Sequence, residues 1–352
     1  MIENIRLQNF RSYHDGSFEF DKGVNIVVGP NGSGKTNLLE AVLVLATGSS
    51  FRAKDAELIG FGGSWARLDG WFGHSQRTLK IILQGTSLQK SFVIDEKPYR
   101  RLSLERSLPV VLFEPNDLQL LGHGPQRRRD YFDDILQRTQ AGYKSLNVKY
   151  YRALVQRNAL LKQPAAAAAQ QMFAWNIRLS ELGAQIAKTR RQLIGDINKT
   201  IGETYSKIAH QKTAVNLVYK SPFSDANYSS KLLLKLEASA TLDLQRGFTS
   251  YGPHREDVII YLSDQVASSM ASRGETRSLL LALKIFELQL LQKVHEQKPI
   301  FLLDDVFSEL DAARRQHLVK HLKGYQSIIT TTDADAVLEY FAGKHNLIPL
   351  QK

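Results

Sequence analysis

Residues 24–36 constrain the fold more than any other part of the chain, because a strand, a glycine-rich turn and a helix start follow one another there. The apolar run Val24–Val28 indicates a strand, and the pattern GxxxxGK[ST] comes directly after it. Its residues are Gly29, Pro30, Asn31, Gly32, Ser33, Gly34, Lys35 and Thr36. The glycines let backbone N–H groups converge on phosphate oxygens, Lys35 can reach the β- and γ-phosphates, and the Thr36 hydroxyl suits Mg²⁺. The sequence therefore predicts an α/β fold that binds ATP and Mg²⁺.

Two adjacent carboxylates, Asp304 and Asp305, follow the apolar run Ile300–Leu303 near the other end of the chain. Such a run is typical of a buried parallel strand, and ligands bind at the carboxyl ends of such strands. We predict that Asp304 holds the Mg²⁺ shell and that Asp305 orients the attacking water, which makes Asp305 and Lys35 the catalytic candidates. The alternative is that the two aspartates only cap a helix. Neither end forms an ATP site alone, so folding has to bring them together.

The segment Ser272–Thr276 precedes a strongly apolar helix that runs from Leu279 through Leu291. Physically it is a helix N-terminus with a serine hydroxyl and a small glycine, which suits an anion. An ordinary capped helix start explains the same residues equally well.

The order of these motifs resembles that of the ABC-type ATPase heads, and within that class the chain is similar to the RecF family of bacterial recombination mediators. The matching features are a phosphate loop, a serine-containing segment before a helix, a strand that ends in two aspartates, and Ser308–Asp311. Further landmarks lie along the whole chain, at residues 9–13, 48–52, 125–129, 252–255 and 304–311. The resemblance implies an ABC-type P-loop ATPase head with mixed β-sheets and an inserted α-helical arm.

The resemblance also implies that each ATP is shared between two subunits. Ser272 and Gly274 would contact the γ-phosphate held by the Lys35 loop of a second copy, so that ATP joins a head-to-tail homodimer. Asp311 would lie across that interface, and Arg11 would lie near the nucleotide. The implied partners are DNA, RecR and RecO, acting to load RecA at single-stranded gaps.

Three positions depart from the family pattern. Glu275 stands where a glutamine is common, and it is expected either to cap its own helix or to pair with Arg273 or Arg277. No switch histidine follows the last core strand, where Thr330–Asp333 stand instead, so that Asp333 or a threonine takes its place. The Q-loop glutamine has no clear counterpart, although Glu114–Asp117 occupy the expected region.

The positive charge of the chain is confined to its middle. The net charge is +11, and residues 127–247 contain 20 Lys and Arg against 9 Asp and Glu. Such a segment suits a polyanion, because phosphate neutralisation releases counterions, although a solvated helical face remains the alternative. Arg127, Arg128 and Arg129 are the candidate DNA contacts, or they pair at helical spacing with the nearby acids Asp130, Asp133 and Asp134.

Other residues of this segment are expected to serve the fold. We interpret Lys188, Arg190 and Arg191 as a solvated face, and Tyr150, Tyr151 and Trp175 as helical core rather than base-stacking platforms. A stripe at spacings of three, four and seven predicts one long amphipathic helix packed against the preceding one. Its members are Leu179, Leu182, Ile186, Leu193, Ile197, Ile201, Tyr205 and Ile208. Pro164 marks the break before it, and Ala165–Ala169 form a linker or frayed start.

The predicted plan is a discontinuous head, residues 1–126 and 248–352, around a mainly helical basic arm, residues 127–247. Short β-branched or aromatic runs predict its strands at residues 2–10, 24–28, 65–72, 78–83, 110–113, 258–262, 300–303 and 327–331. The head helices are predicted at residues 35–45, 274–292 and 312–322. Residues 122–125 form the turn where the pattern becomes helical.

Composition excludes several classes of function. The chain has 0 cysteines, which excludes disulfides, thiolate metal sites and cysteine catalysis. Without a signal-like N-terminus or a membrane-length apolar run, a cytoplasmic protein without a membrane partner is expected.

Three function hypotheses follow. The leading one is a slow Mg²⁺-dependent ATPase whose nucleotide state controls DNA clamping in gap repair, replication restart and the SOS response. A small-molecule P-loop kinase is the alternative from another class, and it leaves the serine segment and the basic arm unexplained. A transporter-associated ATPase would call for a membrane partner surface and usually the switch histidine.

Overall fold

A computed structural model describes residues 1–163, 165–341 and 345–351. The chain forms two compact units. The first unit contains Met1–Leu118 and Leu280–Lys352, and the second contains Gln119–Leu279. In the described part of the chain, no helix combines the length and the apolarity that crossing a bilayer requires.

A parallel sheet forms one layer of the first unit. Its strand order is β14-β3-β13-β12-β8, and every neighbouring pair is parallel. The strands are β3 (Val24–Val28), β8 (Val110–Phe113), β12 (Ile300–Asp304), β13 (Ser327–Thr331) and β14 (His345–Pro349). All residues of β12 and β13 are buried, which explains the apolar run Ile300–Leu303 of β12. Since β13 separates β3 from β12, the carboxyl ends of the two motif-bearing strands lie at one edge, as the sequence requires.

An antiparallel sheet forms another layer of the same unit, with the order β2-β1-β4-β5-β6-β7. Its strands are β1 (Asn4–Phe10), β2 (Tyr13–Glu19), β4 (Trp65–Phe72), β5 (Ser75–Gln84), β6 (Ser87–Ile94) and β7 (Lys97–Tyr99). The sequence patterns identified β1, β4 and β5 but missed β2, β6 and β7, which carry many exposed polar residues. A strand with many polar residues has little of the apolar alternation on which such a prediction depends.

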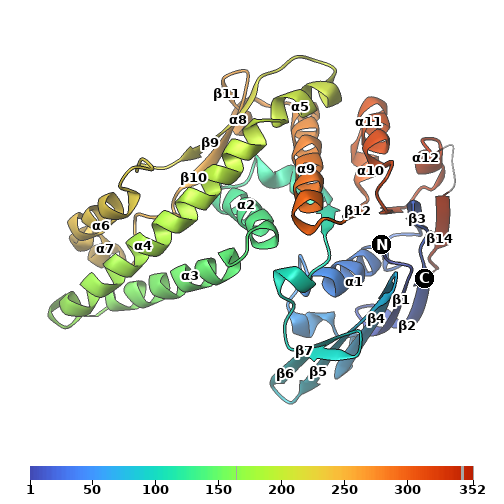
Figure 1. The fold of residues 1–352 in the computed structure, drawn as a ribbon, viewed down its shortest axis with the longest axis horizontal. Coiled ribbons are helices and arrows are strands. Elements are labelled where there is room, and N and C mark those ends of the chain that lie inside the picture. Colours follow the sequence, from blue (N-terminus) through green and yellow to red (C-terminus); the bar gives the residue numbers. More distant parts are fainter. Residues whose placement is uncertain (164, 342–344, 352) are drawn as a thin grey trace. The chain divides into compact units, whose positions relative to one another are not determined.

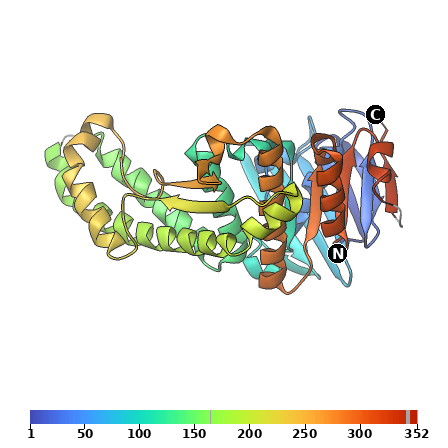
Figure 2. The same ribbon diagram turned by 90° about the horizontal axis from the view of Figure 1, so that it is seen from above.

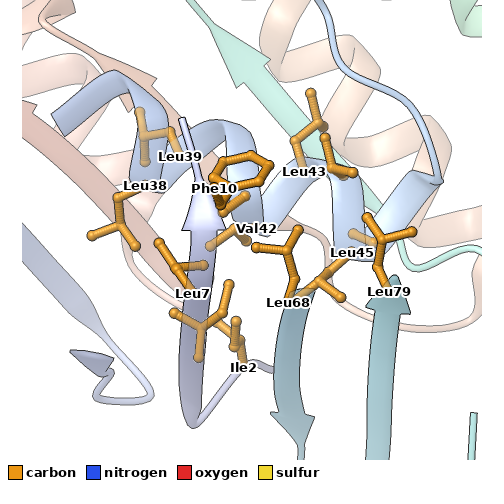
Figure 3. Packing of buried hydrophobic residues seen from close by; sticks show 14 of the residues in the cluster. Ile2, Leu7, Phe10, Leu38, Leu39, Val42, Leu43, Leu45, Leu68 and Leu79 are labelled. Carbon is orange, nitrogen blue, oxygen red and sulfur yellow. The ribbon is translucent and has the colours of Figure 1, made fainter. Parts of the chain in front are cut away.

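Helix α1 (Lys35–Thr47) lies between the two sheets and contacts strands of both. This position explains why the helix is apolar almost all round, with ten of its residues buried, from Lys35 to Ala46. Figure 3 shows Leu38, Val42 and Leu45 of the helix among Leu7 and Leu68 of the antiparallel sheet. Replacing one such leucine by alanine would cost about 2–5 kcal/mol of folding free energy. The core thus holds the helix that begins at the phosphate loop.

Short helices complete the first unit (Figure 1). They are η1 (Asp55–Leu58), η2 (Leu104–Arg106), α10 (Val306–Glu309), α11 (Ala312–Leu322) and α12 (Asp335–Leu338). Helix η3 (Pro115–Leu120) and helix α9 (Arg273–His295) continue from one unit into the other.

The second unit is mainly helical. Its helices are α2 (Pro125–Thr139), α3 (Tyr143–Leu160), α4 (Ala165–Asn198), α5 (Ile201–Ala209), α6 (Tyr228–Ala238), α7 (Ala240–Arg246) and α8 (Ala267–Met270). Helices α3 and α4 pack along one another, as both ribbon views show (Figures 1 and 2). The unit also contains a small antiparallel sheet with the order β11-β10-β9. Its strands are β9 (Val215–Lys220), β10 (Asp257–Leu262) and β11 (Gln265–Val266).

Two predictions for this unit need correction. The apolar stripe does not form one helix, because α4 ends at Asn198 and Ile201, Tyr205 and Ile208 belong to α5. The alanine run is the start of α4 rather than a linker, and the predicted break at Pro164 lies outside the described residues. Periodicity survives a short break in a helix, so the stripe alone did not reveal it.

The boundaries between the units also differ from the sequence-based ones. Residues 248–279 belong to the second unit rather than to the head. The reason is strand pairing, since all six residues of β10 pair with β9, from Asp257 opposite Lys220 to Leu262 opposite Val215. A strand pattern alone does not say which sheet the strand joins.

Candidate functional site

The phosphate loop connects β3 to α1 with a backbone that requires glycine. Gly32 and Gly34 have positive φ angles of +83° and +96°, which residues with a side chain rarely adopt. A Cβ atom at Gly34 would also lie 2.9 Å from the Tyr13 hydroxyl and 3.0 Å from Ser12 Oγ. The Tyr13 hydroxyl donates a hydrogen bond to the Gly34 carbonyl at 3.0 Å, so the β1–β2 turn is attached to the loop.

The loop has the properties of a phosphate cradle. A Cβ atom at Gly32 would meet open space, whereas one at Gly29 would lie 2.7 Å from both Ser33 Oγ and the Leu350 carbonyl. The Ser33 hydroxyl is buried and has no hydrogen-bond partner among the described residues. A buried polar group without a partner is costly, and an anion in the loop would supply one. Pro30 and Asn31 form the exposed tip.

Lys35 is held inside this loop. Its side chain is buried, and its ammonium group donates to the carbonyls of Gly29 at 2.7 Å and Pro30 at 3.0 Å. A cation enclosed by backbone oxygens at the start of a helix is suited to anionic phosphate. The residue therefore lies next to the glycine-rich turn, as the sequence predicts.

The structure brings the two distant motifs together. The Thr36 hydroxyl donates to Asp304 Oδ1 at 3.0 Å, although 268 residues separate them. Thr36 lies in the first turn of α1 and Asp304 ends β12, so both are fixed by elements of the core. A hydroxyl and a carboxylate oxygen at this distance are hard oxygen ligands of the kind that Mg²⁺ binds.

Asp305 follows in a left-handed backbone conformation, with φ of +52°, and occupies the N-cap position of α10 without a capping bond from its side chain. Burial raises the pKa of Asp305; the Lys35 ammonium opposes this, while the carboxylates of Asp304 and Glu309 add to it. A carboxylate with a raised pKa is a stronger base than an ordinary aspartate, which suits proton transfer from water.

Arg11 lies beside the loop, but its guanidinium is held by Glu40. Its Nε and Nη2 atoms donate to the two Glu40 oxygens, both at 2.8 Å. Glu40 is completely buried on α1 and also accepts from Arg52 Nη2 at 3.0 Å and from Ser50 Oγ. Burial acts to raise the pKa of Glu40, but these hydrogen bonds outweigh it and lower the pKa. Sequence reasoning missed Glu40, and the signal available was one acid within an otherwise apolar helix.

Ser272 and Gly274 belong to the second unit, at the start of α9. The Ser272 N–H donates to Glu275 Oε2 at 2.8 Å, and the Glu275 N–H donates to Ser272 Oγ at 3.2 Å. This reciprocal pair is a capping box, and the bond from the Ser272 N–H lowers the pKa of Glu275. The expectation that Glu275 caps its own helix is confirmed.

Two other family landmarks have local partners. Asp311 caps α11 by accepting the Arg314 N–H at 3.0 Å, and it also forms an ion pair with the Arg314 side chain. In the segment that replaces the Q-loop glutamine, Asp117 accepts the Glu114 N–H at 3.0 Å. The Lys284 ammonium lies 3.1 Å from the same Asp117 oxygen.

The arginine cluster at the start of α2 is largely internal. Arg128 Nε and Nη2 form two bonds to Asp257, at 2.9 and 2.7 Å, and Arg129 Nη1 donates to the Glu256 carbonyl at 2.8 Å. Both side chains are buried because α2 packs against β10, so neither faces a DNA phosphate in this structure. Arg127 is half-buried and donates to Gln119 Oε1 at 3.1 Å.

Arg128 and Arg129 are therefore neither exposed DNA contacts nor partners of the nearby acids at helical spacing. The nearby acid Asp133 instead accepts two bonds from Arg190, both at 2.8 Å, and Asp134 pairs with Arg138. Arg190 is buried as well, so the prediction that it belongs to a solvated face is wrong. A buried guanidinium requires a partner, and these partners come from distant parts of the chain.

Exposed positive charge lies instead on α3 and on its connection to α4. Between Asp134 and Glu181 the chain has no acidic residue, and Lys144, Lys149, Arg152 and Lys162 have exposed side chains. Lys144 and Arg152 line an open groove of about 870 Å³. Tyr150 is buried as expected, whereas Tyr151 and Trp175 are only partly buried and line this groove.

Comparisons with known proteins show which family the chain resembles. Residues 1–343 match the family model described as RecF/RecN/SMC N terminal domain. The chain is 32% identical to the DNA replication and repair protein RecF of Geobacter metallireducens over 345 residues, which is 96% of this chain and 94% of that protein.

Solved structures give the same result. A structure described as the recombination mediator protein RecF-ATPrS in the RecFOR pathway superposes with a TM-score of 0.87 and 29% identity, covering 100% of this chain and 98% of that one. A SmcHead bound to the C-winged helix domain of ScpA shares the fold alone, with a TM-score of 0.56 and 17% identity over 96% of this chain and 91% of that one. The chain therefore belongs to the RecF family, and its fold is that of an ABC-type ATPase head with a helical arm.

Proposed function

We propose that the protein is an ATP-dependent, DNA-binding recombination mediator. The observation that carries this proposal is the hydrogen bond between Thr36 and Asp304, which joins the phosphate loop to the paired aspartates. Relatives named for DNA replication and repair, and a relative solved with ATPrS, support the choice of ligand and process.

Each residue of the site has a role that its geometry supports. Backbone N–H groups of the loop, such as those of Gly32 and Gly34, and the Lys35 ammonium would bind the phosphates, and Thr36 with Asp304 would hold Mg²⁺. Asp305, with its raised pKa, would accept a proton from the attacking water. When bound, Mg²⁺-ATP supplies the phosphoanhydride whose cleavage resets the protein between two states. Slow turnover suits such a switch.

The capping box leaves Ser272 able to contact a nucleotide held by a second copy. Because Ser272 Oγ accepts the Glu275 N–H, its own hydroxyl proton remains able to donate to a phosphate oxygen. Ser272 and Gly274 of one copy would reach the γ-phosphate bound by the other copy, with Asp311 across the interface. ATP would thereby assemble a homodimer, and hydrolysis would release it.

The basic arm would supply the DNA contacts. Lys144, Lys149, Arg152 and Lys162 are exposed in a stretch without acids, so they suit phosphates better than the buried Arg128 and Arg129. Two such arms on a dimer would clamp DNA in the cytoplasm during gap repair, replication restart and the SOS response. RecR and RecO are the proposed protein partners.

Sedimentation with and without a non-hydrolysed ATP analogue tests assembly, and DNA affinity measured in parallel tests the switch. Lys35→Met removes the phosphate cation, and Ser272→Arg blocks the site in trans. We expect the wild type to dimerise and to bind DNA more tightly with the analogue, and both variants to lose this response. An unchanged ATP dependence in both variants would overturn the clamp.

A further inference from the structure

Thr330 occupies the position on β13 between the two halves of the ATP site. It pairs in register with Val27 of β3 on one side and with Asp304 of β12 on the other. Its side chain is completely buried. Sequence comparison alone left open whether Asp333 or a threonine replaces the switch histidine in this region.

The Thr330 hydroxyl has two close polar partners of opposite kind. The distance from its Oγ1 to Asp304 Oδ1 is 2.8 Å, and the distance from the Asp305 backbone N to the same Oγ1 is 2.9 Å. The Asp305 N–H can only donate, so Thr330 accepts there. The single hydroxyl proton then goes to Asp304, since the other acceptor, the Leu303 carbonyl, is neutral and lies at 3.4 Å.

A directed chain of hydrogen bonds results. The Asp305 N–H donates to Thr330, and the Thr330 hydroxyl donates to Asp304 Oδ1. Thr36 donates to that same carboxylate oxygen at 3.0 Å. One hydroxyl thus fixes the rotamer of Asp304 and the left-handed backbone of Asp305, whose φ of +52° is unfavourable for a residue with a side chain.

We propose that Thr330 is a positioning residue for ATP hydrolysis, which acts through Asp304 and Asp305. The inference rests on the proposed ATPase function and adds a residue to it. Outer-shell partners of this type orient the groups that bind the metal and the water, and their loss typically costs about 10- to 100-fold in metal affinity or activity. The neighbouring hydroxyl of Thr331 has a different task, because it closes the turn by bonding to Asp333.

The test uses three substitutions of Thr330 and one control. Thr330→Val removes the hydroxyl at constant shape, and Thr330→Ser restores the hydroxyl that Thr330→Ala lacks. The control is Thr78→Val on β5, because Thr78 is also a buried strand threonine that donates to a carboxylate, Asp69 Oδ1 at 2.6 Å. Measurements are kcat, KM for ATP, affinity for a non-hydrolysed analogue, and the Mg²⁺ concentration for half-maximal turnover.

We expect Thr330→Val and Thr330→Ala to lower kcat, or to raise the Mg²⁺ concentration for half-maximal turnover, by about 10- to 100-fold, with analogue affinity changed much less. Thr330→Ser should keep most of the activity, and Thr78→Val should reduce stability without moving either quantity. Two results would overturn this inference but leave the proposed function standing. One is a turnover of Thr330→Val equal to that of the wild type, and the other is an equal loss of activity in Thr330→Ser and Thr330→Ala. A wild type that neither binds nor hydrolyses ATP overturns the proposed function as well.

Discussion

Arg11 and Glu40 form a two-bond ion pair, with both N–O distances at 2.8 Å, beside the first turn of the helix that begins at the phosphate loop. Arg11 has a positive φ of 53°, so the β1–β2 turn is held in a conformation that needs support. Glu40 supplies it from a fully buried position and binds Arg52 as well. The same ion pair ties the turn between β1 and β2 to α1, the helix that begins at the phosphate loop.

Replacing Glu40 by glutamine should therefore destabilise the first unit. The variant leaves two guanidinium groups beside a neutral amide, and breaking a buried pair costs about 3–5 kcal/mol. Urea unfolding of wild type and Glu40→Gln measures the free energy of unfolding. Glu203→Gln is the control, since Glu203 forms an exposed helical pair with Lys207 and should change nothing measurable. Equal stability of all three proteins would contradict this role for Glu40.

The same carboxylate predicts a dependence of stability on pH. The pKa of Glu40 is lower in the folded protein than the ordinary glutamate value of 4.5, so the folded state binds fewer protons than the unfolded state. Its contribution is fully present above pH 4.5 and is lost as the pH falls through the folded pKa. We expect the stability of the wild type to fall more steeply below this pH than that of Glu40→Gln. Parallel acid limbs for the two proteins would show that Glu40 is not the group responsible.

The pKa of Asp305 is raised rather than lowered, and we expect this carboxylate to act as a base in ATP hydrolysis. Asp305→Asn keeps the size of the side chain but removes the proton acceptor, so we expect a loss of about 10²–10⁴-fold in ATP turnover with nucleotide affinity retained. Because burial raises the pKa of Asp305 above 3.8, the acid limb of the wild-type turnover profile should lie above that pH. Single-turnover hydrolysis across a pH series measures both effects. Retained turnover in Asp305→Asn would assign the base elsewhere.

The local part of the site could be predicted from the sequence, because motif and neighbouring element coincide there. The phosphate loop needs a strand, two positive-φ glycines and a helix, and Val24–Val28, Gly32, Gly34 and Lys35 supply them in order. The contact between Thr36 and Asp304 could also be predicted from the sequence, since parallel strands expose their carboxyl ends at one edge of the sheet.

The partners of buried polar groups could not be predicted in this way. Arg128 pairs with a residue 129 positions away, and Arg190 with one 57 positions away. A count of charged residues shows neither which distant residue each arginine pairs with nor whether its side chain is buried. Both arginines were therefore interpreted as surface residues. Thr330 was hidden for a similar reason, because a threonine in an apolar strand fits the strand equally well with or without a role in the site.

The two kinds of cation in the basic arm should respond differently to substitution. Lys144→Glu with Arg152→Glu reverses two exposed charges beside the groove, so DNA affinity should fall while the free energy of unfolding stays near that of the wild type. Each lost phosphate contact lowers the slope of log affinity against log salt by about 0.9 on duplex DNA. The double variant should therefore lose about two units of slope, measured by fluorescence anisotropy at several salt concentrations.

Arg128→Gln provides the structural contrast. It removes one member of the nearly buried pair with Asp257, so it should lower the free energy of unfolding by about 3–5 kcal/mol. The fraction of this variant that remains folded should bind DNA with the salt slope of the wild type, because the guanidinium faces Asp257 and not solvent. A reduced slope in folded Arg128→Gln, together with a normal slope in the double variant, would return the DNA contacts to the start of α2. The reverse pattern places them on α3, where the exposed lysines and arginine have no acidic neighbour in sequence.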